Sequence, residues 1–521
     1  MMSKLKMSGA IRTMCVVLVL SVLPSLALAQ GQDKAKSDSP RHETSAKGAS
    51  RNRTTSSGKK SLTKGSTATR SGSTSQGRNT SGTKTASRTT PYSPALHRSG
   101  TTAPGARGGA NAVHSRPTKA FAMRDGSRGV EQFHANGTRS SIHAHGMTLN
   151  YGAHGERTIV TRRPDGSRLV SVGPGRGYVE RPFIRGGHPY MQRTYVYGGR
   201  TYVNVYRGYS WHGGVYYGYM PHYYYGHSFY GWAYAPWGAP VVWGWGWGPA
   251  PWYGYNAYYF APAPVYPYPA LWITDYLLAA NLQAAYDARV AANAAAAPPA
   301  PPASTSGDNV QPSSGQSAAA GSANAVVLTP EVKQEIADEV KTQVAAERDA
   351  AANTNAQQAP ASTTSDAQPP AALDPAQRTF IVSTALNEQT AAGADCSVTA
   401  GDVLTRIDDS PDAKHDVTVL VTTSQKGDCA SGTRFAVGVQ DLQDMHNHFQ
   451  EQVDDGLATL ADSSGKNGLP AAPAPSPTPV ADAQAKPDPT AATDLQQEQQ
   501  DANKTETEVQ GAAKSTPPSG N

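Results

Sequence analysis

The chain has 521 residues, which is long enough for three or four domains of about 150 residues each. Glycine and proline make 89 of these residues, about 17% against roughly 12% on average, and only 38% of the chain is apolar. This composition excludes one large hydrophobic core that runs through the whole chain. The net charge of +6 is unevenly distributed: residues 30–120 carry 17 basic and 3 acidic groups, residues 121–300 carry 14 and 7, and residues 301–521 carry 12 and 30. We therefore expect the first half to attract anionic polymers and the second half to repel them.

Residues 1–29 have the pattern of a signal peptide. Lys4, Lys6 and Arg12 precede a short apolar run at 15–23, and the small residues of Ala27-Leu28-Ala29 suit a signal peptidase. The sequence predicts export to the periplasm, the cell surface or the extracellular space, with a mature chain that starts at Gln30. The alternative is a retained membrane anchor, but about ten apolar residues are too few to cross roughly 30 Å of hydrocarbon. We expect no transmembrane segment in the mature chain, because no later run is long and apolar enough.

Residues 30–120 predict a disordered basic tail. They consist mostly of Ser, Thr, Gly, Lys and Arg, so no core offsets the entropy that ordering them costs. Such a tail suits an acidic glycan or an anionic membrane face. We do not expect nucleic acid as a partner, because the tail lacks interleaved aromatic side chains and export would separate it from nucleic acid.

A glycine-punctuated repeat runs through residues 121–207. Turn-type pairs recur every 9–12 residues, at Asp125-Gly126, Asn136-Gly137, His145-Gly146, His154-Gly155, Asp165-Gly166, Pro174-Gly175, Gly186-Gly187 and Gly198-Gly199. Asp-Gly and Asn-Gly tolerate the positive φ of tight hairpin turns, and the runs between them suit short strands. The predicted fold class is mixed and largely disordered, with an antiparallel β-meander or β-solenoid of about eight strands, an aromatic region rich in Gly and Pro, and a small α+β module.

Four of these turns place an arginine two residues after the glycine, at Arg128, Arg139, Arg157 and Arg168. If the turns stack on one edge of the sheet, the guanidinium groups form a row that suits an anionic polymer. The alternative is that these arginines only protect sheet edges from pairing with other chains. Histidines 134, 143, 145 and 154 lie on neighbouring repeats, but nothing in the sequence makes them converge, so we predict no metal site.

Residues 208–297 form the predicted aromatic region, which ends in a helix over about 271–293. Residues 190–272 hold 30 aromatic side chains, and Trp243, Trp245 and Trp247 alternate with glycine. Exposed in one piece, this surface would exceed what a soluble monomer tolerates. We predict that it forms a second layer over the meander, or alternatively an adhesive surface on which sugar rings stack. The three tryptophans are therefore added to the four arginines as candidate polymer-binding residues.

Two linkers, at 298–328 and 353–375, flank a helix predicted at 329–352. Thr329 suits the N-cap of this helix and Pro330 its first turn. The apolar residues Val332, Ile336, Val340 and Val344 form a narrow stripe that suits docking on a partner or self-association.

Residues 376–462 predict a small α+β domain of about five strands followed by a helix over 441–460, with an apolar side chain every three or four residues of that helix. Once residues 1–29 are removed, Cys396 and Cys429 are the remaining cysteines, which predicts one disulfide in an exported chain. The alternative is two buried free thiols. Residues 463–521 are rich in Pro, Ala, Gln and acidic side chains, and we predict a disordered tail.

No catalytic motif or cofactor-binding fingerprint is recognisable, so no catalytic residue and no cofactor are predicted. Residues 163–168, 231–237, 271–276 and 439–445 carry arginine-rich, aromatic and helical phrases that resemble uncharacterised exported bacterial proteins rich in Tyr, Trp and Gly, over about 120–461. This resemblance implies export. It implies nothing about an activity and gives no catalytic residue. The resulting hypothesis is a non-enzymatic envelope or extracellular protein that binds an anionic or saccharide polymer, such as an envelope polysaccharide, while its acidic C-terminal module contacts a protein partner. The alternatives are a self-assembling structural subunit without a ligand and an unrecognised hydrolase.

Overall fold

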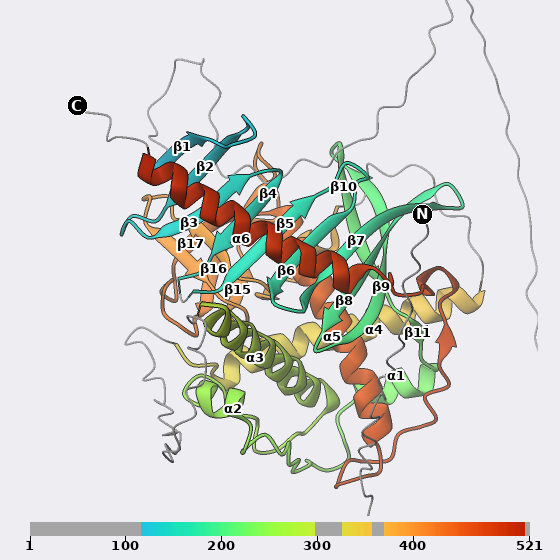
Figure 1. The fold of residues 1–521 in the computed structure, drawn as a ribbon. Coiled ribbons are helices and arrows are strands. Elements are labelled where there is room, and N and C mark those ends of the chain that lie inside the picture. Colours follow the sequence, from blue (N-terminus) through green and yellow to red (C-terminus); the bar gives the residue numbers. More distant parts are fainter. Residues whose placement is uncertain (1–115, 154, 297–325, 357–368, 516–521) are drawn as a thin grey trace, which may run out of the picture. The chain divides into compact units, whose positions relative to one another are not determined.

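A computed structural model describes residues 116–153, 155–296, 326–356 and 369–515 (Figure 1). The predicted signal peptide, almost all of the predicted basic tail and most of both predicted linkers lie outside these residues.

The described chain begins with a ten-stranded antiparallel sheet in which each strand pairs with the next, which confirms the predicted meander. Its strands are β1 (Thr118–Ala122), β2 (Arg128–Phe133), β3 (Arg139–Ala144), β4 (Met147–Tyr151), β5 (Arg157–Arg162), β6 (Arg168–Gly173), β7 (Arg176–Arg185), β8 (His188–Tyr197), β9 (Arg200–Trp211) and β10 (Gly214–Met220). The sheet does not end at residue 207 as predicted, because β9 and β10 continue it to Met220.

Local turn chemistry sets the pairing of these strands. At Asp125-Gly126 and Asp165-Gly166 the glycines have φ of 82° and 83°. The aspartate Oδ1 accepts a hydrogen bond from the backbone N–H two residues later, at 2.8 Å from Ser127 and 2.9 Å from Ser167. These side-chain turns close the hairpins at the positions that the sequence predicts.

One face of the meander is covered by α6 (Ala491–Ser515), which crosses several strands in Figure 1. Ala502 and Val509 of α6 pack on buried side chains that include Ile142, Leu149 and Ile159. The first part of the helix packs on a smaller cluster. The prediction of a disordered tail over 463–521 is therefore wrong for residues 464–515.

The reason for this error lies in how the C-terminal segment is held. In α6, Leu495 and Val509 are the only large apolar side chains, so the sequence has no apolar stripe. The helix is attached by a few small or isolated apolar side chains and by carboxylates that pair with meander arginines, such as Asp494 with Arg163 at 3.2 Å. The segment before α6 contains β18 (Thr478–Pro479), which pairs with β11 (Tyr223–Tyr224), and the short 3-10 helix η2 (Ala481–Ala483).

The opposite face of the meander contacts α5 (Val439–Ser463) and α3 (Pro269–Ala296). Tyr195 donates a hydrogen bond to Glu451 of α5 at 2.9 Å, and Arg176 pairs with Asp287 of α3 at 3.2 Å. Asn447 of α5 also bonds the backbone of β10, accepting from the Tyr219 N–H and donating to the carbonyl of residue 217. A side-chain amide thus satisfies backbone groups on a strand that ends the sheet.

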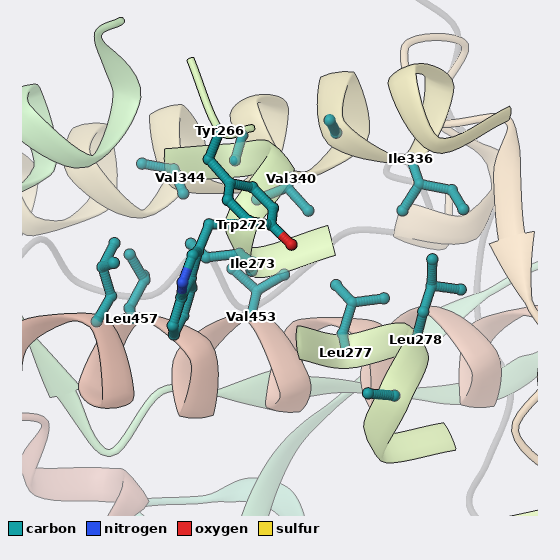
Figure 2. Close-up of a cluster of buried hydrophobic side chains, with 14 of the residues drawn as sticks. Tyr266, Trp272, Ile273, Leu277, Leu278, Ile336, Val340, Val344, Val453 and Leu457 are labelled. Atoms are coloured by element: carbon teal, nitrogen blue, oxygen red, sulfur yellow. The ribbon is translucent and has the colours of Figure 1, made fainter. Parts of the chain in front are cut away.

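Apart from its last helix α3, which contacts the meander, the aromatic segment does not form the predicted second layer over the sheet. It contains α1 (His227–Tyr234) and α2 (Pro251–Asn256), and it packs with α3, α4 (Pro330–Ala356) and α5 in one hydrophobic cluster. Figure 2 shows Trp272 and Tyr266 among the aliphatic side chains of these three helices. The apolar stripe of α4 is buried here by Ile336, Val340 and Val344, so these side chains are already partnered within the chain.

A buried ion pair lies inside this cluster. Lys333 of α4 donates to Asp275 of α3 at 2.7 Å, and Asp275 also accepts from the Tyr266 hydroxyl at 2.7 Å and from the backbone N–H of Ala263 at 2.5 Å. Asp275 is fully buried. Three donors from separate segments therefore depend on one carboxylate.

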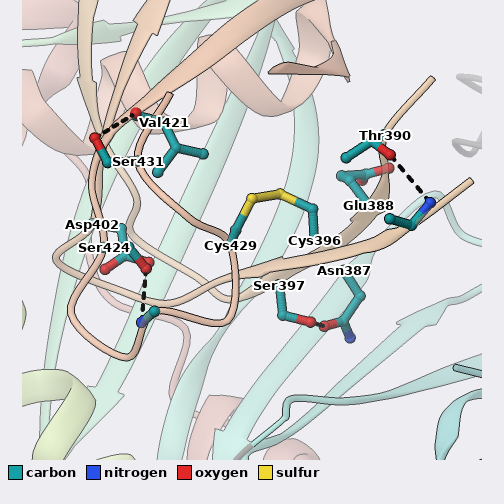
Figure 3. Close-up of a disulfide and its surroundings, with 12 residues drawn as sticks. Asn387, Glu388, Thr390, Cys396, Ser397, Asp402, Val421, Ser424, Cys429 and Ser431 are labelled. Atoms are coloured by element: carbon teal, nitrogen blue, oxygen red, sulfur yellow. Dashed lines mark hydrogen bonds between the residues drawn. A yellow bond between two sulfur atoms is a disulfide. The ribbon is translucent and has the colours of Figure 1, made fainter. Parts of the chain in front are cut away.

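The C-terminal module is a four-stranded sheet of order β12-β15-β16-β17 with a separate hairpin, β13-β14. Its elements are η1 (Ala371–Leu373), β12 (Thr379–Ile381), β13 (Leu386–Gln389), β14 (Asp395–Val398), β15 (Val403–Arg406), β16 (Asp416–Thr423) and β17 (Arg434–Gly438), followed by α5. Five of these strands match the prediction, and β13 is additional. Cys396 and Cys429 form the predicted disulfide, with their Cα atoms 4.6 Å apart (Figure 3).

A buried carboxyl pair joins α4 to α5. Glu347 accepts hydrogen bonds from the Tyr230 hydroxyl at 3.2 Å and from the Gln343 amide, and Asp454 accepts from the Tyr219 hydroxyl at 2.9 Å. Burial raises the pKa of Glu347 to about 7 and that of Asp454 well above its ordinary value, and each carboxyl is also next to the other.

This pair predicts a pH-dependent stability. The folded chain keeps a proton that the unfolded chain loses near pH 4.5, so the free energy of unfolding falls as the pH rises from about 4.5 to about 7, by about 1.4 kcal/mol per pH unit for one proton. Urea unfolding at several pH values measures this slope. Glu347→Gln is expected to make this slope shallower by the share of one proton, while Asp402 and Glu388, whose pKa values burial also raises, keep contributing to it. Glu335→Gln, at an exposed position on the same helix, is expected to leave the slope unchanged. Equal slopes in the two variants would show that the Glu347 carboxyl is not a source of this pH dependence.

Candidate functional site

The four candidate arginines do not form a row on one edge of the sheet. Each is the first residue of its strand, and successive strands run in opposite directions, so Arg128 and Arg168 begin at one end of the sheet while Arg139 and Arg157 begin at the other. Arg139 pairs with Glu131, and Arg157 pairs with Glu506 of α6 at 3.3 Å. Arg128 is exposed.

Arg168 belongs to a buried polar network between the sheet and α5. Its guanidinium lies 3.3 Å from Glu180 and 3.7 Å from Asp444 of α5. Arg193 contacts the same two carboxylates at 2.6 and 3.2 Å, and its guanidinium lies 4.5 Å from the centre of the Tyr178 ring. These groups hold the helix against the sheet and leave Arg168 little freedom to bind a polymer.

The three candidate tryptophans are half-buried and stack within the chain. Trp245 stacks on Trp247, with ring centres 4.3 Å apart, and on Trp272 at 4.7 Å. Its indole N–H donates to the Tyr266 hydroxyl at 2.6 Å, which in turn donates to Asp275. Trp243 meets Trp272 edge-on at 5.8 Å. The structure therefore uses these rings mainly as part of the hydrophobic cluster around α3.

An open cleft of about 630 Å³ lies elsewhere on the meander, and we call it the β7–β8 groove. Its lining residues come from two segments about 290 positions apart in the chain, namely Phe183, Arg185 and Gln192 of β7 and β8, and Gln484, Ala485 and Lys486 between η2 and α6. The sheet supplies one wall, and the C-terminal segment supplies the other.

On the sheet side this groove is lined by one aromatic ring and one guanidinium, those of Phe183 and Arg185, and the Tyr190 ring next to Phe183 is buried. Phe183 and Tyr190 are cross-strand partners whose rings stack with centres 5.4 Å apart and an angle of 18° between planes. The Arg185 guanidinium lies 5.3 Å from the Phe183 ring centre and 5.9 Å from that of Tyr190. Arg207 of β9 is the register partner of Tyr190 on its other side. The hairpin register thus places two guanidinium groups beside one pair of rings.

Hydrogen bonds hold the C-terminal wall against the sheet and fix the Arg185 guanidinium in place. Arg185 donates to the carbonyl of Asp482 at 2.9 Å, and its guanidinium lies 3.7 Å from the Asp482 carboxylate. Gln192 donates to the Lys486 carbonyl at 2.8 Å, and Tyr190 donates to the Asp482 carboxylate at 3.1 Å. Burial raises the pKa of Tyr190, so its hydroxyl remains a neutral donor.

The groove has an excess of positive charge. Arg185 is 40% exposed and shares Asp482, whereas Lys486 has no carboxylate within ion-pair distance among the residues described. Arg207 lies next to Tyr190 in the sheet but does not line the groove. Guanidinium and ammonium groups beside an aromatic platform can bind a sugar ring that carries a carboxylate, sulfate or phosphate. Among the described residues that line the groove there is no carboxylate.

A second cleft, of about 440 Å³, lies where the β9–β10 turn meets the C-terminal module. Trp211, His212 and His415 line it together with prolines and the acidic loop around Asp412. The Trp211 ring is only 6% exposed, and the His212 ring lies against it with centres 4.2 Å apart. Asp409 at its rim is already bound to Arg378 and Arg406. This cleft therefore offers fewer free polar groups than the β7–β8 groove.

Neither a metal centre nor a membrane-spanning helix is found in the parts of the chain that the structure describes. Within these ranges, no three His, Cys, Asp or Glu side chains are placed to share a metal ion. None of the described helices combines the length and the apolar character that crossing a bilayer requires.

The sequence predicted a polymer-binding surface of arginines and aromatic rings, but at other residues than those that line this groove. The signal that could have found them is the Gly186-Gly187 turn, which is flanked on one strand by Phe183 and Arg185 and on the other by Tyr190. Lys486 reaches the groove only because residues 463–521, which the sequence predicted to be a disordered tail, are folded at this point.

Comparison with protein-family models, curated proteins and solved structures finds no match to this chain.

Proposed function

We propose that this is an exported, non-enzymatic protein of the cell envelope or extracellular space that binds an acidic polysaccharide in the β7–β8 groove. The observation that carries this proposal is the Phe183 ring, which stacks on Tyr190 and has Arg185 beside it, together with Lys486, which has no carboxylate partner among the described residues. Phe183 offers a ring on which a sugar can stack, and Arg185 and Lys486 supply charge for its acidic groups.

The openness of the groove to solvent along the sheet suits a polymer more than a small ligand. A small-molecule site usually encloses most of its ligand, whereas this cleft is bordered on one side by a hairpin and on the other by an extended segment. Export is supported by the disulfide, because such bonds persist in oxidising compartments.

Binding of dextran sulfate by the mature chain, with uncharged dextran of the same length as the comparison, tests the proposal. Arg185→Gln and Lys486→Gln are each expected to weaken dextran sulfate binding about tenfold, because each removes a charge-assisted hydrogen bond. Phe183→Ala is expected to weaken it by removing the ring platform.

The matched control is Arg200→Gln, which removes one positive charge at the exposed start of β9. It is expected to change the affinity less than twofold. Equal losses in Arg200→Gln and Arg185→Gln would mean that net charge alone attracts the polymer, and the groove would then have no specific role.

A further inference from the structure

The arginines that continue the groove along the sheet are already occupied by an acidic segment of the same chain. Going along that segment, Asp482 meets Arg185, Asp488 meets Arg181, Asp494 meets Arg181 and Arg163, and Glu506 meets Arg157. The carboxylate numbers rise as the arginine numbers fall, so the segment crosses the sheet in one direction. An acidic segment, helical from Ala491 onward, thus already lies across a series of guanidinium groups.

The contacts in the first part of this segment are largely polar, and besides the ion pairs the Asp488 backbone N–H donates to the Thr194 hydroxyl at 3.0 Å. Asp494 lies 3.2 Å from Arg163 and 3.1 Å from Arg181, with side-chain exposures of 20%, 31% and 36%. Partly exposed ion pairs of this kind contribute little and weaken with salt. Between residues 487 and 494 the only buried apolar side chain is Ala491.

The second part of the segment is attached differently. Ala502 and Val509 pack into a cluster that includes Ile142, Leu149 and Ile159, all of them fully buried. Leu495 lies at the boundary between the two parts. The start of α6 can therefore separate from the sheet at a low cost in apolar surface while the rest of the helix stays in place.

We propose that residues 487–494 are an intramolecular stand-in for the polymer, and that an acidic polysaccharide entering the β7–β8 groove displaces them and takes over Arg181 and Arg163. This inference rests on the proposed function and extends its binding site from Arg185 to two further arginines. The acidic groups of the polymer replace Asp488 and Asp494, and the first turn of α6 moves away from the sheet.

The distribution of groups around these arginines favours this exchange. Besides Asp488 and Asp494, Arg181 faces Asp165 at 3.6 Å, which is 57% exposed and belongs to the sheet itself. The groove wall at residues 484–486 is held separately, because Gln484 donates to the carbonyl of His222 at 2.9 Å and Gln192 donates to that of Lys486. The wall can therefore stay while the start of α6 leaves.

Asp494→Asn tests this inference in the full mature chain, with dextran sulfate as the probe. Removing this carboxylate weakens the intramolecular competitor, so the variant is expected to bind dextran sulfate about fivefold more tightly than the unchanged protein. Asp488→Asn is expected to act in the same direction. Because neither carboxylate belongs to a hydrophobic cluster, the variants are expected to keep the tryptophan fluorescence of the folded protein.

The matched control is Asp501→Asn, seven residues further along the same helix, where the carboxylate contacts only Lys504 and Gln497 of α6. It removes the same charge and is expected to change the affinity less than twofold. If Asp494→Asn binds dextran sulfate no more tightly than Asp501→Asn does, residues 487–494 do not compete with the polymer, and the proposed displacement is wrong. The proposed function fails separately, namely if Phe183→Ala and Arg185→Gln leave dextran sulfate binding unchanged.

Discussion

Replacing Asp275 by asparagine is expected to lower the free energy of unfolding by about 3–5 kcal/mol. The substitution leaves the buried Lys333 ammonium without its counterion, and an unpaired buried charge costs far more than a surface ion pair contributes. It also disturbs the hydrogen bonds that Tyr266 and Ala263 donate to the same carboxylate.

Urea unfolding followed by tryptophan fluorescence measures this loss, because Trp245 and Trp272 lie in the same cluster. Asp338→Asn provides the matched control, since Asp338 is an exposed α4 residue that pairs with Lys341. The control is expected to cost less than about 0.5 kcal/mol. A loss below about 1 kcal/mol in Asp275→Asn would show that this ion pair does not hold α3 and α4 together.

Removal of the disulfide is expected to lower the free energy of unfolding by about 3–4 kcal/mol. Cys396 and Cys429 are 33 positions apart. A cross-link that closes a loop of this size lowers the conformational entropy of the unfolded chain, and this entropy corresponds to the stated loss of stability. Both cysteines are buried in the core of the C-terminal module. We therefore expect no new contact of the reduced side chains that would offset the loss of the bond.

The comparison is between Cys396→Ala/Cys429→Ala and the unchanged protein, each with and without a reducing agent. Reductant should destabilise the unchanged protein and have no effect on the double variant. If reductant leaves the stability of the unchanged protein as it was, the cysteines are free thiols in solution, which is the alternative that the sequence left open.

The meander was predictable because its information is local. An Asp-Gly pair determines the backbone of its own turn, and the hydrogen bond from Ser127 to Asp125 needs no distant partner. The end of the sheet was misplaced because β9 and β10 are built from tyrosine, glycine and polar residues rather than aliphatic ones. In β9 the buried residues include Val203, Val205 and Tyr206, so burial there does not follow the two-residue alternation of a half-exposed strand.

The C-terminal segment was not predictable from its own residues. Helix α6 has an acidic and amide-rich sequence that is typical of a solvated tail, and its stability depends on arginines more than 300 positions earlier in the chain. The opposite charges of the two halves were visible in the sequence. We interpreted them as attraction and repulsion of external polymers, whereas the structure pairs many of them with each other.

The candidate site was also not predictable from local sequence, because its residues come from segments far apart in the chain. A guanidinium row was a sound expectation for arginines that follow hairpin turns, but strand direction alternates, and this separates Arg128 from Arg139. The arginines that do line up, Arg157, Arg163 and Arg181, are aligned by a segment that the sequence did not place. The predicted protein partner of the acidic module, self-association and export remain predictions.

Hydrogen exchange of the mature chain, with and without saturating dextran sulfate, tests the central claim most directly. The account predicts slower amide exchange in residues 183–192, where the polymer covers the β7–β8 hairpin, and faster exchange in residues 488–495, where α6 begins. Exchange in residues 502–512 should stay the same. Unchanged exchange at 183–192 in the presence of bound polymer would contradict the claim that this groove is the binding site.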